Sequence, residues 1–79
     1  MGRMSARYIG RKIGMSASGV YNILEELGYV RKDNMGDWTL TALGRESSGR
    51  MSEGSHPVPT FDFEKIIDRI NEYWKRKNE

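Results

Sequence analysis

The chain has 79 residues, of which 30% are charged and none is cysteine, and its formal net charge at pH 7 is +2. A chain of this length forms one small domain that buries only about 60% of its unfolded surface, and without cysteine neither disulfides nor a thiolate zinc site can add stability. No apolar run reaches the roughly 18 residues of a membrane span and no signal-peptide pattern opens the chain, so we expect a cytoplasmic protein with no membrane partner.

The positive charge is concentrated in the first half of the chain. Residues 1–50 hold eight basic and five acidic side chains, whereas residues 51–79 hold five basic and six acidic ones. The first 24 residues contain no acid and four basic residues, which are Arg3, Arg7, Arg11 and Lys12. This asymmetry favours a phosphate-bearing partner; the alternative is a solvated surface on which charges cluster by chance.

A first short helix is predicted over about residues 5–13. Ser5 is a suitable N-cap, and Gly14 ends the helix. One face of this helix is expected to carry Tyr8, Ile9 and Ile13.

A second short helix is predicted over about residues 17–27. Ser16 caps it, and Gly28 stands where a helix commonly ends. Its apolar residues recur at helical spacing and are Val20, Ile23, Leu24 and Leu27.

A β-hairpin is predicted next. Residues 29–32 and 37–41 are rich in β-formers, and residues 33–36 between them form a turn. Trp38 on the second strand is expected in the core, with a stacking role as the alternative.

The rest of the chain is predicted to be a flexible linker and one long helix. Glycine, serine and proline dominate residues 45–60, after a helical turn started by Thr41. The helix spans about residues 61–77, and the basic residues at its end suit a helix C-terminus. Its apolar stripe consists of Phe63, Ile66, Ile67, Ile70, Tyr73 and Trp74. The chain thus divides into residues 1–44, 45–60 and 61–79, and the stripe either packs on the first unit or forms a dimer seam.

Residues 6–25 resemble the helix-turn-helix family of DNA-binding proteins. Gly14 stands at the glycine of the turn, and Gly10 stands at a position that holds a small residue, usually alanine, in that family. The five apolar positions of the pattern are filled by Ile9, Ile13, Met15, Val20 and Ile23. An ordinary helical hairpin is the alternative that satisfies parts of the same pattern.

The hairpin after the two helices extends the resemblance to winged helices. Residues 38–44 look like the wing strand and following turn of prokaryotic winged-helix regulators, and residues 13–40 look like the C-terminal DNA-binding module of phage antirepressors. The resemblance implies a mainly α fold with a small β-hairpin, a winged helix-turn-helix, followed by an amphipathic C-terminal helix. Winged helices normally have a further helix before the first one predicted here. Either the C-terminal helix takes that place, or another subunit closes the core, or the chain is part of a longer protein.

The resemblance implies that helix 17–27 enters the major groove of double-stranded DNA with its N-terminal end first. Asn22 is suited to read adenine, and Tyr21 to reach a phosphate or a thymine methyl group. The base-reading residues implied are Ser16, Ala17, Ser18, Tyr21 and Asn22. For the serines, N-capping or plain exposure to solvent is an equal alternative.

Phosphate contacts are expected from basic residues beside that helix. The set comprises Arg7, Arg11, Lys12, Arg31 and Lys32, and its alternative is a solvated surface. Asp33 and Asp37 bracket the hairpin tip and weaken the case for a contact there. One domain of this size buries little surface on DNA, so tight specific binding needs a dimer or a second module.

No enzymatic activity, metal site or cofactor is predicted. The spacing of Asp33, Met35 and Asp37 resembles part of a calcium loop, but the remaining ligands and the glycine of such a loop are missing. His56 is the only histidine and lies in the expected linker, where we expect it to be exposed.

We therefore expect a transcription regulator of a bacterium or a phage, located at the nucleoid when bound to DNA. Its partner would be double-stranded DNA, and a homodimer through the C-terminal helix stays open beside a monomer. The alternative function is a protein-interaction adaptor, similar to an antirepressor, that uses the same fold without binding DNA.

Overall fold

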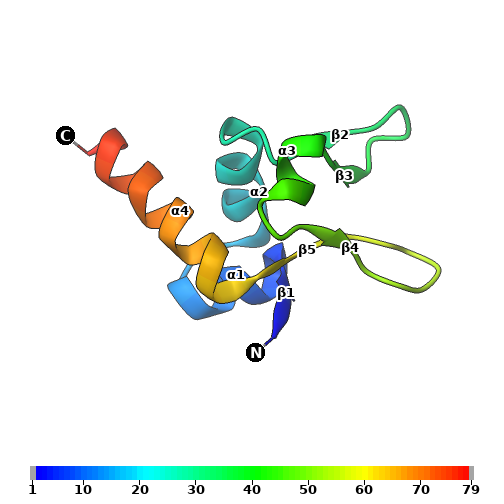
Figure 1. Ribbon diagram of the computed structural model, residues 1–79, viewed down its shortest axis with the longest axis horizontal. Helices are drawn as coiled ribbons and strands as arrows, with labels where there is room; N and C mark the ends of the chain where they lie inside the picture. The colour runs from blue at the N-terminus through cyan, green and yellow to red at the C-terminus, as the bar shows by residue number, and fades with distance from the viewer. Residues whose placement is uncertain (1, 79) are drawn as a thin grey trace.

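Four helices and five short strands make up the part of the chain that the structure, a computed structural model, describes, which is residues 2–78 (Figure 1). In chain order they are β1 (Arg3–Ser5), α1 (Ala6–Ile13), α2 (Ala17–Glu26), β2 (Val30–Lys32), β3 (Trp38–Leu40), α3 (Ala42–Glu46), β4 (Arg50–Met51), β5 (Pro59–Asp62) and α4 (Phe63–Lys77). The strands form two antiparallel sheets, β1–β5–β4 and β2–β3, so the fold is mixed α/β. No helix within residues 2–78 is long and apolar enough to cross a membrane.

The two helices predicted near the N-terminus are confirmed, as is the glycine break between them. α1 ends at Gly14, whose φ of +76° is left-handed, and α2 begins after Ser16, whose Oγ accepts a hydrogen bond from the Gly19 amide at 3.1 Å. At Gly10, an added Cβ would stand 2.2 Å from the carbonyl oxygen of Met15. The position therefore admits no side chain, which is a stricter requirement than the small residue expected from the sequence.

The buried face of α1 differs from the prediction at Tyr8. Ala6, Ile9 and Gly10 are buried, whereas Tyr8 is 56% exposed. Successive helical residues are rotated by about 100°, so a stripe at positions i, i+3 and i+4 leaves Tyr8 outside it. The assignment of Tyr8 to the apolar face is wrong. Ser5 occupies the N-cap position, but its side chain makes no capping hydrogen bond.

The predicted hairpin is confirmed, with strands slightly shorter than expected. β2 and β3 pair antiparallel, with Lys32 opposite Trp38. Asp33 organises the tip, because its Oδ1 accepts hydrogen bonds from the amides of Met35 at 2.9 Å and Asp37 at 3.0 Å. Asp33 is therefore a turn-forming residue.

Residues 45–60 do not form a linker, which corrects the prediction. They include β4 and the start of β5, and β5 is the central strand of the three-stranded sheet. Met4 on β1 lies opposite Phe61, and Met51 on β4 lies opposite Pro59. Pro59 is tolerated because it is the first residue of its strand. This sheet also makes the fold less predominantly helical than expected.

Two side-chain caps determine where the helices after the hairpin begin. The Oγ1 atom of Thr41 accepts a hydrogen bond from the Gly44 amide at 3.0 Å, so the helical turn predicted after Thr41 is confirmed as α3. Asp62 caps α4 by accepting a hydrogen bond from the Glu64 amide at 3.1 Å. α4 therefore begins at Phe63, later than predicted, because the preceding residues belong to β5.

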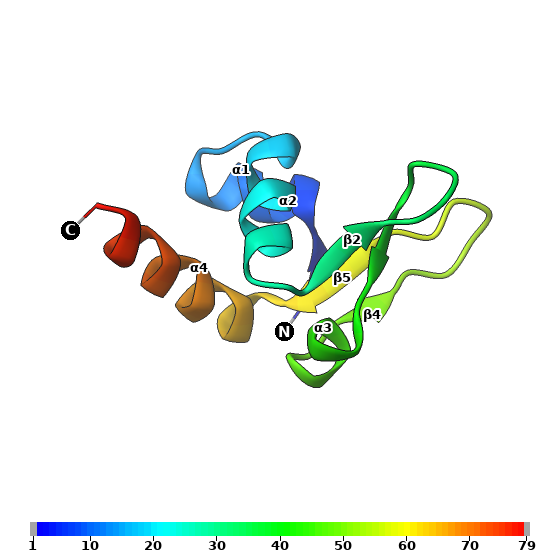
Figure 2. The ribbon, with the colours of Figure 1, turned by 90° about the horizontal axis from the view of Figure 1, so that it is seen from above.

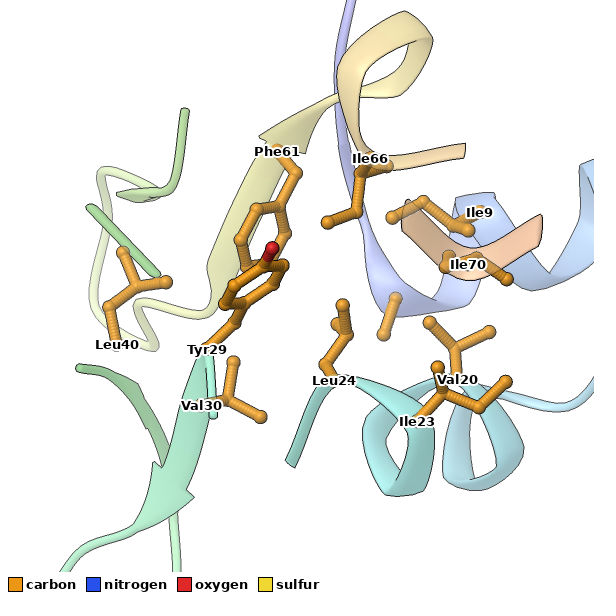
Figure 3. Close-up of a cluster of buried hydrophobic side chains, with 11 residues drawn as sticks. Ile9, Val20, Ile23, Leu24, Tyr29, Val30, Leu40, Phe61, Ile66 and Ile70 are labelled. Carbon is orange, nitrogen blue, oxygen red and sulfur yellow. The ribbon is translucent and has the colours of Figure 1, made fainter. Parts of the chain in front are cut away.

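The core lies between the first two helices, β5 and α4 (Figure 3). Its largest fully buried side chains include Phe61, Ile9, Leu24, Ile66 and Ile70. In Figure 3, Phe61 and Ile66 point toward the same space as Leu24. The C-terminal part of the chain thus completes the core that the first two helices begin.

α4 packs on the rest of the domain through the predicted stripe. Ile66 and Ile70 are buried, and Trp74 near the helix end is 42% exposed. The remaining members of the stripe, which are Phe63, Ile67 and Tyr73, are half-buried. The radius of gyration is 11.8 Å, close to the roughly 11.6 Å expected of a compact chain of this length. α4 is therefore part of the domain and not a separate tail.

Candidate nucleic-acid interface

The outward face of α2 carries a row of polar side chains. Ser18, Asn22 and Glu25 are all exposed, while Val20 and Leu24 on the opposite face are buried. Residues four and three positions apart lie on the same side of a helix, so the three polar side chains form one continuous row. Asn22 can donate and accept hydrogen bonds at the same time, and Glu25 can only accept when it is ionised.

The leading end of α2 has a low profile. Ser16 is exposed, and its hydroxyl oxygen is used to cap the helix. Ala17 and Gly19 are half-buried, and neither has a side chain longer than a methyl group. Ser16 and Ala17 thus shape the helix end, and Ser18 carries the first freely exposed hydroxyl of the row.

Tyr21 faces the hairpin. Its ring stacks on that of Trp38, with centroids 4.7 Å apart and an interplanar angle of 8°. Both residues are half-buried, and burial raises the pKa of the Tyr21 phenol above 10.0. The structure therefore places Tyr21 at the joint between α2 and β3 and not in the exposed polar row.

The two basic residues of β2 point in opposite directions. Side chains alternate across a strand, so Lys32 lies on the face of the hairpin that carries Trp38, and Arg31 lies on the other. The Nζ atom of Lys32 is 5.2 Å from the centroid of the Trp38 ring. Lys32 is thus close to α2, whereas Arg31, paired with Thr39, faces away from the α2 joint.

The basic residues of α1 form an exposed cationic surface. Arg7, Arg11 and Lys12 are exposed, and none of them forms an ion pair within residues 2–78. The guanidinium carbon of Arg11 lies 5.6 Å from the centroid of the Tyr8 ring. Arg11, Lys12 and Tyr8 also line an open cavity of about 550 Å³, and Arg3 and Met4 complete its wall.

Glu26 has partners that the sequence did not indicate. Its carboxylate accepts a hydrogen bond from the hydroxyl of Tyr73 and lies 3.9 Å from the Nζ atom of Lys77. Both partners are on α4, so Glu26 connects the ends of α2 and α4. No local sequence signal can reveal this contact, because the partners are 47 residues or more apart.

Two loops project from the end of the molecule opposite the C-terminal end of α4 (Figure 2). They are the β2–β3 loop and the β4–β5 loop, which together line a cavity of 260 Å³ beside Tyr21 and Trp38. His56 lies exposed in the second loop. Asp33, Asp37 and Glu53 make this end of the molecule less favourable to phosphate than the surface of α1.

An apolar groove lies between the flank of α2 and the end of α4. Its volume is about 300 Å³, and it is lined by Met15, Gly19, Ile23, Tyr73, Trp74 and Lys77. The sequence predicted the aromatic residues as members of one stripe, but the groove depends on how α4 crosses α2.

Within residues 2–78, no three carboxylate or imidazole side chains gather as they would around a metal ion. Comparison of the chain with known proteins gives no match to a family model, to a curated protein or to a solved structure. The function must therefore be argued from the arrangement of the side chains themselves.

Proposed function

We propose that this chain is a winged helix-turn-helix protein that binds double-stranded DNA, with α2 in the major groove. Two observations carry the proposal, which are the exposed polar row of α2 and the exposed cations of the preceding helix α1, which form no ion pair within residues 2–78. A major groove about 12 Å wide admits a helix, and basic side chains on the neighbouring elements would meet phosphates. In this proposal β2 and β3 form the wing.

The side chains of the polar row suit the edges of base pairs. Asn22 can pair with adenine through N6 and N7, and Ser18 can bond to either a base or a phosphate. The small residues at the start of α2 favour a close approach of the backbone. Arg7 and Arg11 would hold the helix in register through phosphates, and Lys32 is better placed than Arg31 to reach the same groove.

The biological role that fits such binding is transcription regulation in the cytoplasm of a bacterium or a phage-infected cell. A single module of this kind buries about 600–1,000 Å² on DNA, so we expect moderate affinity from a monomer and tighter binding from a dimer or a tandem site. No cofactor or metal enters this proposal.

An amide chemical-shift titration with duplex DNA tests the proposal. We expect the largest shifts at residues 7–12 and 16–25, with smaller ones at Lys32, and we expect Asn22→Ala to weaken binding. Asn71→Ala, at an exposed position on α4, is a matched control that should leave binding and the pattern of shifts unchanged. If no duplex in a random-sequence mixture causes shifts at about 50 mM salt, where phosphate contacts are strongest, the proposal is wrong.

A second candidate function is that of a protein-interaction adaptor, favoured by the groove between α2 and α4. Trp74 is a large aromatic side chain at the groove and is 42% exposed. Aromatic residues of this kind are enriched at protein interfaces. A partner bound there would lose affinity in Trp74→Ala and keep it in Asn22→Ala, whereas DNA binding would show the opposite pattern.

A further inference from the structure

We propose that Glu25 is a specificity-determining residue that selects cytosine, at a base pair next to the adenine read by Asn22. This inference rests on the proposed DNA binding and goes beyond it, because it states which bases the site must contain. It is carried by the different surroundings of two neighbouring glutamates.

Glu25 and Glu26 are adjacent in sequence but have different environments. The Glu26 carboxylate is occupied by the Tyr73 hydroxyl and lies near the Lys77 ammonium group, so it has partners within the fold. Glu25 is exposed, and its carboxylate has no hydrogen bond or ion pair within residues 2–78. Only Glu25 is free to bind an external donor.

Glu25 lies near the C-terminal end of α2 and continues the row that would face the groove, so it would meet a base pair farther along the groove than those near Ser18. It follows Asn22 by three residues and Ser18 by seven, which keeps all three on one side of the helix. Three helical residues correspond to a rise of about 4.5 Å, close to one base-pair step of about 3.4 Å. Asn22 and Glu25 would therefore meet neighbouring base pairs.

The chemistry of a carboxylate restricts the base that it can meet. An ionised carboxylate accepts hydrogen bonds and donates none. In the major groove, cytosine presents the N4 amino donor, guanine presents only acceptors, and thymine presents an acceptor and a methyl group. Adenine has a donor, but the N7 acceptor beside it would repel the second carboxylate oxygen. Cytosine is the one base whose edge suits Glu25.

Phosphate repulsion makes this selection sharper. A carboxylate in the groove is repelled by the backbone phosphates of every sequence, and only a base that donates a hydrogen bond offsets this cost. Glu25 would therefore act mainly by rejecting the other bases, while Arg7 and Arg11 on α1 supply attraction that is independent of sequence.

Selection of bound duplexes from a random-sequence library, carried out on the full chain, tests the inference. We expect the wild-type protein to enrich sequences with adenine and cytosine at neighbouring positions. Glu25→Gln should replace the preferred cytosine by adenine, because glutamine pairs with adenine N6 and N7, and it should reduce discrimination for cytosine by about ten-fold. Glutamine and glutamate have similar helix propensities, so the variant should keep its fold, which circular dichroism verifies.

Glu53→Gln is the control for charge, because Glu53 is an exposed acid outside α2. It should leave the enriched sequence unchanged. If Glu25→Gln and Glu53→Gln both enrich the wild-type sequence, Glu25 reads no base, although the proposed DNA binding stands. If the wild-type protein binds duplex DNA but enriches no particular sequence, the role of Glu25 is also overturned. Absence of binding to any duplex overturns the proposed function and this inference together.

Discussion

The ring of Tyr21 on α2 lies nearly parallel to the ring of Trp38 on β3, with 4.7 Å between their centroids. Aromatic pairs in this arrangement contribute about 0.5–1.5 kcal/mol beyond the area that they bury. The stack joins the hairpin to the helix whose exposed face carries Asn22. The orientation of that face therefore depends on the hairpin as well as on α1.

Replacing Trp38 by alanine should destabilise the domain by about 2 kcal/mol, which is less than full removal of a buried tryptophan because Trp38 is half-buried. Urea denaturation followed by circular dichroism measures the change. Trp74→Ala is the matched control, because the same side chain is removed from an exposed position, and it should cost less than about 1 kcal/mol. Equal losses in the two variants would contradict the structural role of the stack.

The free energy of unfolding should decrease as the pH rises above about 10, in part because of Tyr21. Burial raises the pKa of this phenol in the folded state above 10.0. The unfolded chain then loses the Tyr21 proton at a lower pH than the folded chain does. The stability from this group is complete below pH 10 and is lost as the pH passes through the folded-state pKa. In urea denaturation at a series of alkaline pH values, the free energy of unfolding of Tyr21→Phe should fall less steeply with pH than that of the wild type. The same dependence on pH in both proteins would contradict the raised pKa of Tyr21.

Gly10→Ala should destabilise the domain by about 3 kcal/mol, because the new methyl group would collide with the backbone of Met15 and force α1 and α2 apart. Thermal unfolding measures the effect. Gly2→Ala provides the comparison, since a Cβ at that position meets nothing within 4 Å, and we expect its melting temperature to match that of the wild type. A fully stable Gly10→Ala variant would mean that the turn is looser than described.

Arg7→Ala should weaken binding to all duplexes to a similar extent. In a plot of the logarithm of the binding constant against the logarithm of the salt concentration, each phosphate contact contributes about −0.9 to the slope. Loss of the Arg7 contact should therefore make the slope shallower by about 0.9. Fluorescence anisotropy at several salt concentrations gives the slope. Arg69→Ala is the matched control, because Arg69 lies on α4, 3.7 Å from Glu72. A slope that changes in the control and not in Arg7→Ala would exclude the phosphate role of Arg7.

The elements that depend on local patterns could be predicted from the sequence. The helices around Gly14, the hairpin with its turn at Asp33, and the start of α3 at Thr41 all follow from residues within a few positions of one another. The sheet β1–β5–β4 could not be found in this way, because Met4 pairs with Phe61 near the other end of the chain. Short strands of two to four residues also carry little periodicity of their own.

The candidate site, like the fold, could be predicted from the sequence only where it depends on local patterns. Helical spacing is enough to place Ser18 and Asn22 on one exposed face. The half-burial of Tyr21 and the partners of Glu26 depend on the hairpin and on α4, which pack against α2 only in the folded domain. The role of Glu26 at the end of α2 becomes visible only through its contact with Tyr73 on α4, 47 residues away.

The pairing of β1 with β5 also has a consequence for the order in which the domain can assemble during synthesis. α1, α2 and the hairpin contact one another mainly through residues that are close in sequence, but Ile9 and Leu24 stay uncovered until Phe61 and Ile66 exist. To close the sheet, β1 near the N-terminus must meet β5, which lies more than 50 residues later in the chain. Closing a loop of this length is slow compared with forming a helix. The nascent protein therefore leaves these side chains exposed until β5 and α4 have been made.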